Sequence, residues 1–182
     1  GIGRAAALRL AAEGANVVAT DIDTSALETL ATEIGEAGGS VSCQPFDIGQ
    51  SGQAEATVAH CREHFGQLDV VVNMAGILRF ANVHETPLDV WQRIIDVNLT
   101  GTFMLCKAAL PALIETQGNI VNAASTASLQ GLPWGVAYSA SKGGVLAMTR
   151  TIAVEYAKRG VRANCICPGD IQTNMVAGGT FP

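Results

Sequence analysis

Short apolar runs rich in β-branched residues alternate with longer helical patterns along the whole chain. The runs stop at polar residues, glycine or proline, as buried strands do. Five runs are expected to form strands: 16–21, 41–47, 68–73, 120–124 and 161–167. Five stretches have helical composition and end signals: 4–14, 24–37, 51–65, 88–116 and 138–159. This alternation predicts an α/β fold, a doubly wound parallel sheet with helices on both faces.

The stretch 88–116 is longer than most helices of globular domains. Thr86 and Pro87 are predicted to be its N-cap and first residue. Three residues are expected to kink or divide it: Asn98, Gly101 and Pro111. The sequence contains no repeat, low-complexity segment or linker, so residues 1–182 are expected to form a single domain.

Composition supports one domain and argues against several kinds of partner. The 182 residues are 48% hydrophobic and 15% charged, which suits a sizeable core. The net charge of −5 argues against nucleic acid, which requires a basic surface. No uninterrupted apolar run reaches the roughly 18 residues of a membrane span, and no signal-peptide pattern is found. A cytoplasmic protein without a membrane partner is expected.

The five cysteines are odd in number and scattered along the chain. They are expected to be reduced residues of a cytosolic protein rather than a disulfide framework. Cys165 and Cys167 have a spacing that a metal site can use, but no ligand cluster accompanies them. Two residues on one face of a buried strand is the preferred interpretation, so no metal site is predicted.

Ser125, Tyr138 and Lys142 form the most informative constellation of polar residues. Tyr138 and Lys142 are four residues apart, which puts them on one face of a helix, one turn apart. A phenol has a reference pKa of about 10, and a neighbouring ammonium favours the phenolate, which suits proton exchange with an alcohol. Ser125, at a strand end, could hydrogen-bond the same substrate oxygen. Spacing alone more often describes a surface pair, so the assignment depends on the rest of the chain.

Further candidates lie where the predicted strands end, which is the edge at which a doubly wound sheet binds its ligand. They are Asp21, Asp47, residues 73–76, Ser125 and Pro168-Gly169. Gly1 and Gly3 would let the backbone approach a pyrophosphate at a helix N-terminus, although a flexible helix start also explains them. Asp21 could accept both hydroxyls of an adenosine ribose and repel a 2′-phosphate, or could be a simple strand-end acid.

Together these motifs resemble the short-chain dehydrogenase/reductase family over essentially the whole chain. Gly1-Ile2-Gly3 is similar to the end of the family's glycine-rich loop, and N-M-A-G at 73–76 resembles its N-N-A-G. Asn98, within D-V-N-L, is similar to its structural and catalytic asparagine. The remaining motifs are matched by Ser125, Tyr138, Lys142, Pro168-Gly169 and Thr173. Six motifs in this order and spacing are not expected by chance.

The resemblance implies a Rossmann-like fold and a role for each residue. Tyr138 would be the general acid/base, Lys142 would assist it and bind the nicotinamide ribose, and Ser125 would orient the substrate oxygen. Asn98 would hold a water in a proton relay behind Lys142. The pyrophosphate of the cofactor would lie against Gly1, Ile2 and Gly3. The adenosine ribose would contact Asp21 and Ile22, the adenine would contact Asp47 and Ile48, and the backbone of Asn73, Met74, Ala75 and Gly76 would line the adenosine side. The nicotinamide end would contact Pro168, Gly169, Ile171 and Thr173.

Two residues bear on these implications. Asp21 favours NAD over NADP, whereas Arg4 is a cation at the helix start that could approach a phosphate or be purely structural. Met74 replaces the second asparagine of N-N-A-G, which matters only if that position acts through its side chain.

Both ends depart from the family pattern. The chain begins inside the glycine-rich loop and stops where the family continues with a substrate-covering loop, a helix and a strand. The first strand, central in the family's sheet, is expected to be missing, so the second and fourth strands would face a gap. A fragment of a longer enzyme is therefore expected.

The resemblance implies an NAD(P)-dependent oxidoreductase that interconverts a secondary alcohol and a ketone. Mostly apolar or small residues near the reacting oxygen suggest a hydrophobic substrate: Ser128, Leu129, Leu132, Trp134 and Met175. Leu132 and Trp134 could equally be core or interface residues. The alternatives are a nucleotide-binding but inactive protein and an epimerase or dehydratase. Family members often pair helices corresponding to 99–116 and 138–159, so a homodimer or homotetramer is expected.

Overall fold

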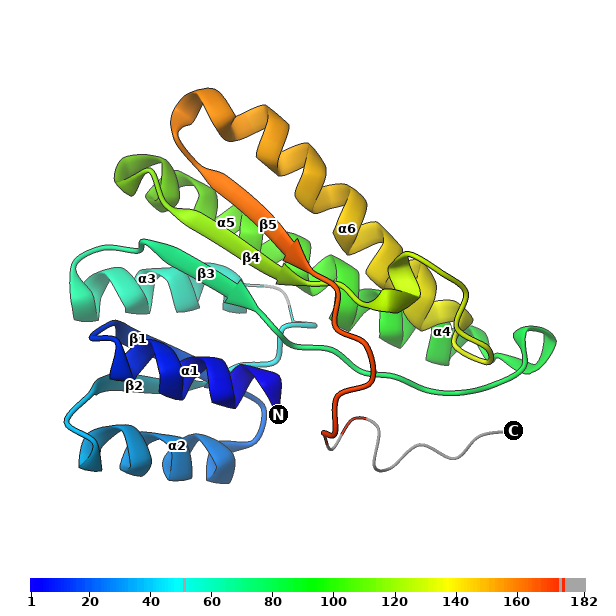
Figure 1. The fold of residues 1–182 in the computed structure, drawn as a ribbon, viewed down its shortest axis with the longest axis horizontal. Coiled ribbons are helices and arrows are strands. Elements are labelled where there is room, and N and C mark those ends of the chain that lie inside the picture. Colours follow the sequence, from blue (N-terminus) through cyan, green and yellow to red (C-terminus); the bar gives the residue numbers. More distant parts are fainter. Residues whose placement is uncertain (51, 174, 176–182) are drawn as a thin grey trace.

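The computed structural model describes residues 1–50, 52–173 and 175 (Figure 1). Its strands are β1 (Asn16–Asp21), β2 (Ser40–Pro45), β3 (Val70–Asn73), β4 (Asn119–Ala123) and β5 (Arg162–Ile166). Its α-helices are α1 (Ile2–Ala12), α2 (Thr24–Glu36), α3 (Gln53–Phe65), α4 (Leu88–Ile95), α5 (Thr102–Thr116) and α6 (Val136–Tyr156). Ser51, the expected start of the third helix, lies outside the described residues. Parallel strands with helices on both sides confirm the predicted Rossmann-like α/β fold.

The strands form two parallel sheets within the described residues: β1 with β2, and β3-β4-β5 in that order. Each sheet has its own apolar cluster. One joins α1, α2 and β1 through small and aliphatic residues: Ala11, Ala19, Leu27, Leu30 and Ile34. The larger one joins β3, β4, α5 and α6, with Leu113 and Ile120 fully buried. β1 and β3, the strands expected to face a gap, are not paired with each other.

Within each sheet the strand register brings the candidate residues to one edge. In the larger sheet Asn73 pairs with Asn122, and Ala123 pairs with Ile166. In the smaller sheet Asp21 is the last paired residue of β1. Because parallel strands end at the same edge of a sheet, the residues that follow each strand gather there.

The long helical stretch is divided as predicted at Asn98 and Gly101, where a π-helical segment, Asp96–Gly101, separates α4 from α5. Pro111, in contrast, lies inside α5 without ending it. The predicted cap was wrong, because Pro87 occupies the N-cap position and the Thr86 hydroxyl donates to Asn82 O at 2.9 Å. The side chain of Thr86 thus stabilises the preceding turn instead of capping α4.

This stretch, Leu88–Thr116, is the one membrane-span candidate in the described part of the chain. It has 29 residues, and its most apolar window has a mean hydropathy of 1.4. Its apolar residues Cys106, Ala109 and Leu113 belong to the larger core cluster. Packing against the sheet therefore accounts for the composition of this helix.

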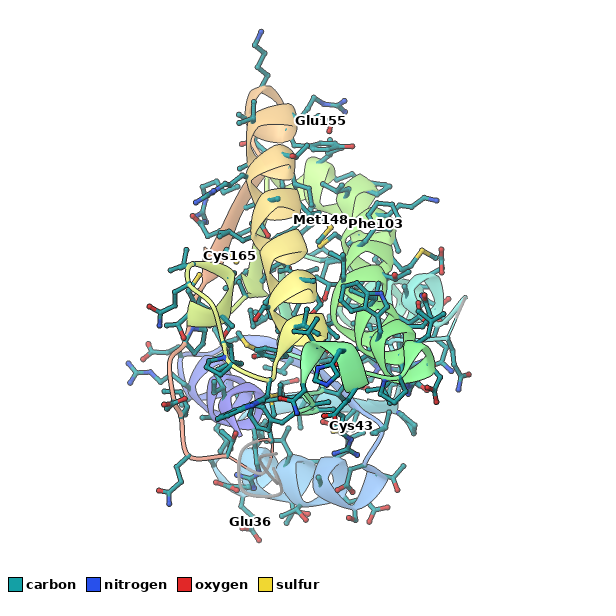
Figure 2. The ribbon with its side chains drawn as sticks, turned by 90° about the vertical axis from the view of Figure 1, so that its right-hand side faces the viewer. Glu36, Cys43, Phe103, Met148, Glu155 and Cys165 are labelled. Carbon is teal, nitrogen blue, oxygen red and sulfur yellow. The ribbon has the colours of Figure 1, made fainter. Side chains whose placement is uncertain are left out.

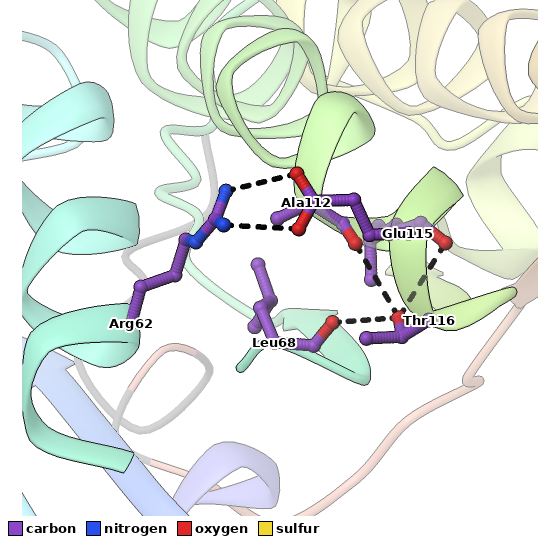
Figure 3. Close-up of polar contacts among 6 residues, drawn as sticks. Arg62, Leu68, Ala112, Glu115 and Thr116 are labelled. Carbon is purple, nitrogen blue, oxygen red and sulfur yellow. Dashed lines mark hydrogen bonds and ion pairs between the residues drawn. The ribbon is translucent and has the colours of Figure 1, made fainter. Parts of the chain in front are cut away.

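Contacts among α3, α5 and the start of β3 fix the end of the sheet opposite the candidate site (Figure 3). The guanidinium of Arg62 donates to both carboxylate oxygens of Glu115, at 3.2 and 2.9 Å. The hydroxyl of Thr116 donates to Leu68 O at 2.9 Å. These bonds tie the last turns of α3 and α5 to each other and to the segment that leads into β3.

Candidate active site

Tyr138 and Lys142 lie side by side on α6, and both are buried. Their exposed fractions are 9% and 4%, and the Lys142 Nζ lies 5.8 Å from the centre of the Tyr138 ring. The Nζ donates a hydrogen bond of 2.7 Å to Ala123 O, at the end of β4. Within the described residues no carboxylate pairs with this ammonium.

Burial changes the acidity of Lys142. Loss of hydration disfavours the charged form and lowers the pKa of the amine to about 8, partly offset by the nearby Cys165. The amine can therefore change its charge close to neutral pH. It also retains donors for oxygen atoms of a ligand, because an ammonium has three and only one bonds Ala123.

Asn98 lies in the π-helical segment and is completely buried. Its Oδ1 accepts from Ile77 N at 2.8 Å, and its Nδ2 donates to Ile77 O at 2.9 Å. Nδ2 also donates to Ser141 Oγ at 3.0 Å. A π-helical turn contains an extra residue and breaks the regular hydrogen-bond ladder, a feature frequent at functional sites. Here it turns a side-chain amide into the interior, where it binds the loop after β3.

Gly76 brings that loop against the same residues. A Cβ atom at Gly76 would lie 3.3 Å from Lys142 Nζ and 3.4 Å from Asn98 Oδ1. It would also lie 3.7 Å from the Cε of Met175, one of the residues expected near the substrate. The absence of a side chain therefore keeps space beside Lys142 and Asn98.

Ser125 begins the short 3₁₀-helix Thr126–Ser128, which packs against α6. Its Oγ accepts a hydrogen bond of 3.1 Å from Ala127 N. Thr126 N donates to Pro168 O at 2.9 Å, which joins the segment after β5 to the segment after β4. The structure thus places Ser125 beside the predicted proline–glycine motif.

The N-terminal glycines meet residues from distant parts of the chain. Gly1 begins α1 without a capping side chain, and a Cβ there would lie 3.8 Å from Thr173 Cγ2. A Cβ at Gly3 would lie 3.3 Å from Met74 Cβ. The first turn of α1, which leaves backbone N–H groups without helical partners, is therefore close to two predicted cofactor residues.

Asp21 is exposed at the end of β1, and its Oδ1 accepts from Asp23 N at 3.0 Å. Its neighbour Ile22 is 71% exposed, as a residue on a binding surface can be. Arg4, the possible phosphate ligand, instead forms an ion pair with Glu33 on α2. The structure therefore directs this guanidinium toward a carboxylate.

The carboxylate of Asp47, predicted from the sequence to contact the adenine, is held by other residues of the protein. Its Oδ1 accepts from Gly49 N at 3.0 Å, and its Oδ2 lies 3.6 Å from the guanidinium of Arg93. Ile48 lies against the π-helical segment, because its carbonyl oxygen would be only 2.6 Å from a Cβ at Gly101. Arg93 was not identified from the sequence, since nothing in the sequence links it to a turn 46 residues earlier.

The side chain of Asn73 points into the protein rather than toward the sheet edge. Its Nδ2 donates to Asn122 Oδ1 at 2.8 Å and to Cys106 Sγ at 3.4 Å. Asn122 Nδ2 donates in turn to Thr149 Oγ1 at 2.9 Å. Any contact of Asn73 with a cofactor would therefore be through its backbone. The sequence signal for this network was an asparagine, Asn122, within an apolar strand pattern.

Comparison with known proteins places this arrangement in a family. The family model described as short chain dehydrogenase matches residues 1–179. The 2-(R)-hydroxypropyl-CoM dehydrogenase of Xanthobacter autotrophicus is 40% identical over 96% of this chain and 72% of its own length. The inactive 2-(S)-hydroxypropyl-CoM dehydrogenase 2 of the same organism is 42% identical over 87% of this chain and 68% of its own length.

Solved structures agree with this match. The structure of actinorhodin polyketide ketoreductase with NADPH superposes with a TM-score of 0.93 at 37% identity. The similarity covers 97% of this chain and 69% of that one. Sequence motifs, fold and relatives agree, and the chain belongs to the short-chain dehydrogenase family.

Proposed function

We propose that this chain is an NAD-dependent oxidoreductase that interconverts a secondary alcohol and a ketone. The observation that carries the proposal is the buried pair Tyr138 and Lys142, with the Nζ 5.8 Å from the ring centre and Gly76 keeping space beside it. Among its relatives, one is named for a 2-hydroxypropyl group, a secondary alcohol, and another is a ketoreductase. Both names concern the interconversion of an alcohol and a ketone, one as oxidation and the other as reduction.

The residues present fit a nicotinamide dinucleotide. Gly1 and Gly3 open an uncapped helix N-terminus, which suits a pyrophosphate. Gly76 leaves space next to Lys142 that a Cβ would fill. When bound, the dinucleotide supplies or accepts the hydride. Lys142 and Thr173 would hold its nicotinamide end, and Asp21 its adenosine ribose.

The chain's own residues would handle the proton and the substrate oxygen. The Tyr138 hydroxyl would take the proton of the alcohol in oxidation and return it in reduction. Ser125 Oγ already accepts from Ala127 N, so its own O–H can donate to the substrate oxygen. Lys142, whose Nζ lies 5.8 Å from the centre of the Tyr138 ring in an environment of low dielectric, would stabilise negative charge on this phenol.

Asp21 and Glu33 together support NAD as the preferred cofactor. The exposed carboxylate of Asp21 would repel a 2′-phosphate. Glu33 pairs with Arg4 and so offsets the nearest cation of the helix start. A related structure contains NADPH, so both cofactors belong in the test.

We also propose a homodimer or homotetramer that assembles through α5 and α6 in the cytoplasm. Figure 2 shows these helices next to each other, with Phe103 and Met148 labelled on the face toward the viewer. Phe103 is 47% exposed and contributes apolar surface to this face of α5. The cysteines of the described residues are free, which fits a reducing compartment.

The proposal is tested with Tyr138→Phe. NADH and NADPH are titrated by fluorescence into both proteins, and turnover is measured with butane-2,3-diol and a panel of aliphatic secondary alcohols. Removal of the hydroxyl is expected to lower kcat by about 10²- to 10⁴-fold, with NADH affinity retained. Equal rates in the two proteins would contradict the proposed role of Tyr138.

An inactive nucleotide-binding protein is the second candidate function. The observation in its favour is the relative described as inactive, at 42% identity. This candidate predicts NADH binding without turnover of any alcohol or ketone in the panel. Reduced cofactor that accumulates with one of the alcohols would exclude it.

A further inference from the structure

Ser141 connects Asn98 to α6, the helix that carries Tyr138 and Lys142. It lies between Tyr138 and Lys142 on α6 and is completely buried. Its hydroxyl donates to Tyr138 O at 2.7 Å, and its Oγ accepts from Asn98 Nδ2 at 3.0 Å. This hydroxyl therefore connects α6 to the π-helical segment.

The direction of these hydrogen bonds fixes the orientation of the Asn98 amide. A backbone carbonyl can only accept, so the Ser141 proton goes to Tyr138 O and its oxygen is left to accept. The amide must then present Nδ2 to Ser141, which leaves Oδ1 for Ile77 N. The N–H of Ile77 can only donate, so both partners select the same amide orientation.

The same connection reaches the proposed reaction site. Asn98 holds both the N–H and the C=O of Ile77, at 2.8 and 2.9 Å. Ile77 follows Gly76, where a Cβ would be 3.3 Å from Lys142 Nζ. A change at Ser141 would therefore alter the position of the Gly76 loop relative to Lys142.

We propose that Ser141 is a positioning residue that holds Asn98, and through it the Gly76–Ile77 loop, at a fixed distance from Tyr138 and Lys142. The proposal rests on the proposed function for its effect on turnover. Its structural part, the hydrogen bonding of Asn98 to the backbone of Ile77, does not depend on any reaction.

Thr149 provides a matched control on the same helix. Its hydroxyl donates to Val145 O at 2.7 Å and accepts from Asn122 Nδ2 at 2.9 Å, and it is 2% exposed. It thus repeats the hydrogen-bond pattern of Ser141, about two turns further from the Tyr138 end. Ser141→Ala and Thr149→Val each remove one such hydroxyl and leave one buried asparagine amide with one partner fewer.

The first measurement is amide hydrogen exchange at Ile77 in the cofactor-free protein. Loss of one hydrogen bond that orients Asn98 is expected to speed exchange of the Ile77 amide about tenfold in Ser141→Ala. Thr149→Val should leave this amide unchanged, although both variants are expected to melt at lower temperature. Equal exchange in the two variants would overturn the proposal, and this measurement remains decisive if the chain turns over none of the alcohols.

The second measurement is turnover as a function of pH. Ser141→Ala is expected to lower kcat about tenfold and to shift the pH of half-maximal kcat, with little change in KM. Thr149→Val should retain both values. Ser141→Cys replaces the hydroxyl with a larger, more weakly hydrogen-bonding thiol and should resemble Ser141→Ala. Wild-type kcat and pH profile in Ser141→Cys and Ser141→Ala would show that the hydroxyl does not position the site.

Discussion

Lys142 is a buried amine whose partner among the described residues is a neutral carbonyl. At pH 7 the amine of the unfolded chain is charged and fully hydrated, whereas that of the folded chain is charged in a poorly hydrated environment, which costs free energy. A pKa lowered from 10.5 to about 8 corresponds to a destabilisation of about 3 kcal/mol at neutral pH. The site thus carries a cost that binding of a hydroxyl-bearing ligand can offset.

Replacement of this amine predicts a pH-dependent stability difference. Lys142→Met should raise the free energy of unfolding by about 2 kcal/mol at pH 7, because the charge is removed and one hydrogen bond is lost. Between pH 8 and 10.5 the folded wild type loses its proton before the unfolded chain does, so wild-type stability rises relative to the variant. The contribution of the charge should therefore be full below pH 8 and absent above 10.5, where only the lost hydrogen bond remains and the variant should be slightly the less stable. Urea unfolding of both proteins across this range measures it, and a constant difference would contradict the burial argument.

Asp21 predicts a change in cofactor choice. Asp21→Asn keeps an acceptor for Asp23 N but removes the negative charge, so NADPH affinity should rise about tenfold with a smaller change for NADH. Asp23→Asn is the matched control, because Asp23 caps α2 through Ala26 N and is also exposed. Fluorescence titrations of both cofactors give the comparison. A wild type that already prefers NADPH would refute the role of Asp21.

The sequence was sufficient to identify candidate site residues, but not most of the residues that they contact in the folded protein. Tyr138 and Lys142 could be paired from helix geometry because they are four residues apart. Glu33 could not be assigned to Arg4, because the pair depends on how α1 packs against α2. Ser141 was missed for a similar reason, since its partner Asn98 is 43 residues away.

At the scale of elements, alanine substitutions at two adjacent glycines of α6, Gly143 and Gly144, are expected to change stability in opposite directions. A Cβ at Gly144 would lie 2.7 Å from Leu99 Cδ2, whereas a Cβ at Gly143 has no neighbour within 4 Å. Gly144→Ala should therefore destabilise the fold by about 1–3 kcal/mol through overpacking. Gly143→Ala should stabilise it by about 0.5–1 kcal/mol through helix propensity. Urea unfolding measures both, and a destabilised Gly143→Ala would indicate that a second subunit covers this face.

Element positions followed closely from the sequence where local signals decide them. The strand expected at 16–21 is β1 (Asn16–Asp21), because its interior is rich in β-branched residues and an acid ends it. Pro111 was expected to kink or divide the long helix, and α5 continues through it, since it lies on the exposed side of the helix, where water can bond the freed carbonyl. Thr86 was misassigned because a turn to Asn82 competes for its hydroxyl.

At the scale of the whole molecule, the proposed oligomer predicts a mass change. Phe103→Lys places a charge on the exposed face of α5 and should convert the dimer or tetramer into a smaller species. Leu10→Lys is the control, because Leu10 is also a partly exposed apolar residue, at 39%, but lies on α1. Light scattering after size exclusion gives both masses. A monomeric wild type would contradict the interface.

The layered arrangement was predictable because strand and helix signals alternate without interruption. The division into two sheets with two apolar clusters depends on pairing between distant strands. The resemblance to a family with a known strand order predicted the gap beside β1 and β3 but not the two separate clusters. The alternation alone is compatible with one continuous sheet.

The π-helical segment sets the rotation of α4 about its axis relative to α5. Each residue of an α-helix turns the chain by about 100°. A π-helical turn holds one residue more than an α-helical turn, so this segment takes up an extra residue while α4 keeps its inward face. Deletion of one residue within α4 itself, between Ile94 and the π-helical segment, would have no such turn to absorb it and would rotate the preceding part of α4 by about that angle. Ile94, now 1% exposed, would then turn away from the core.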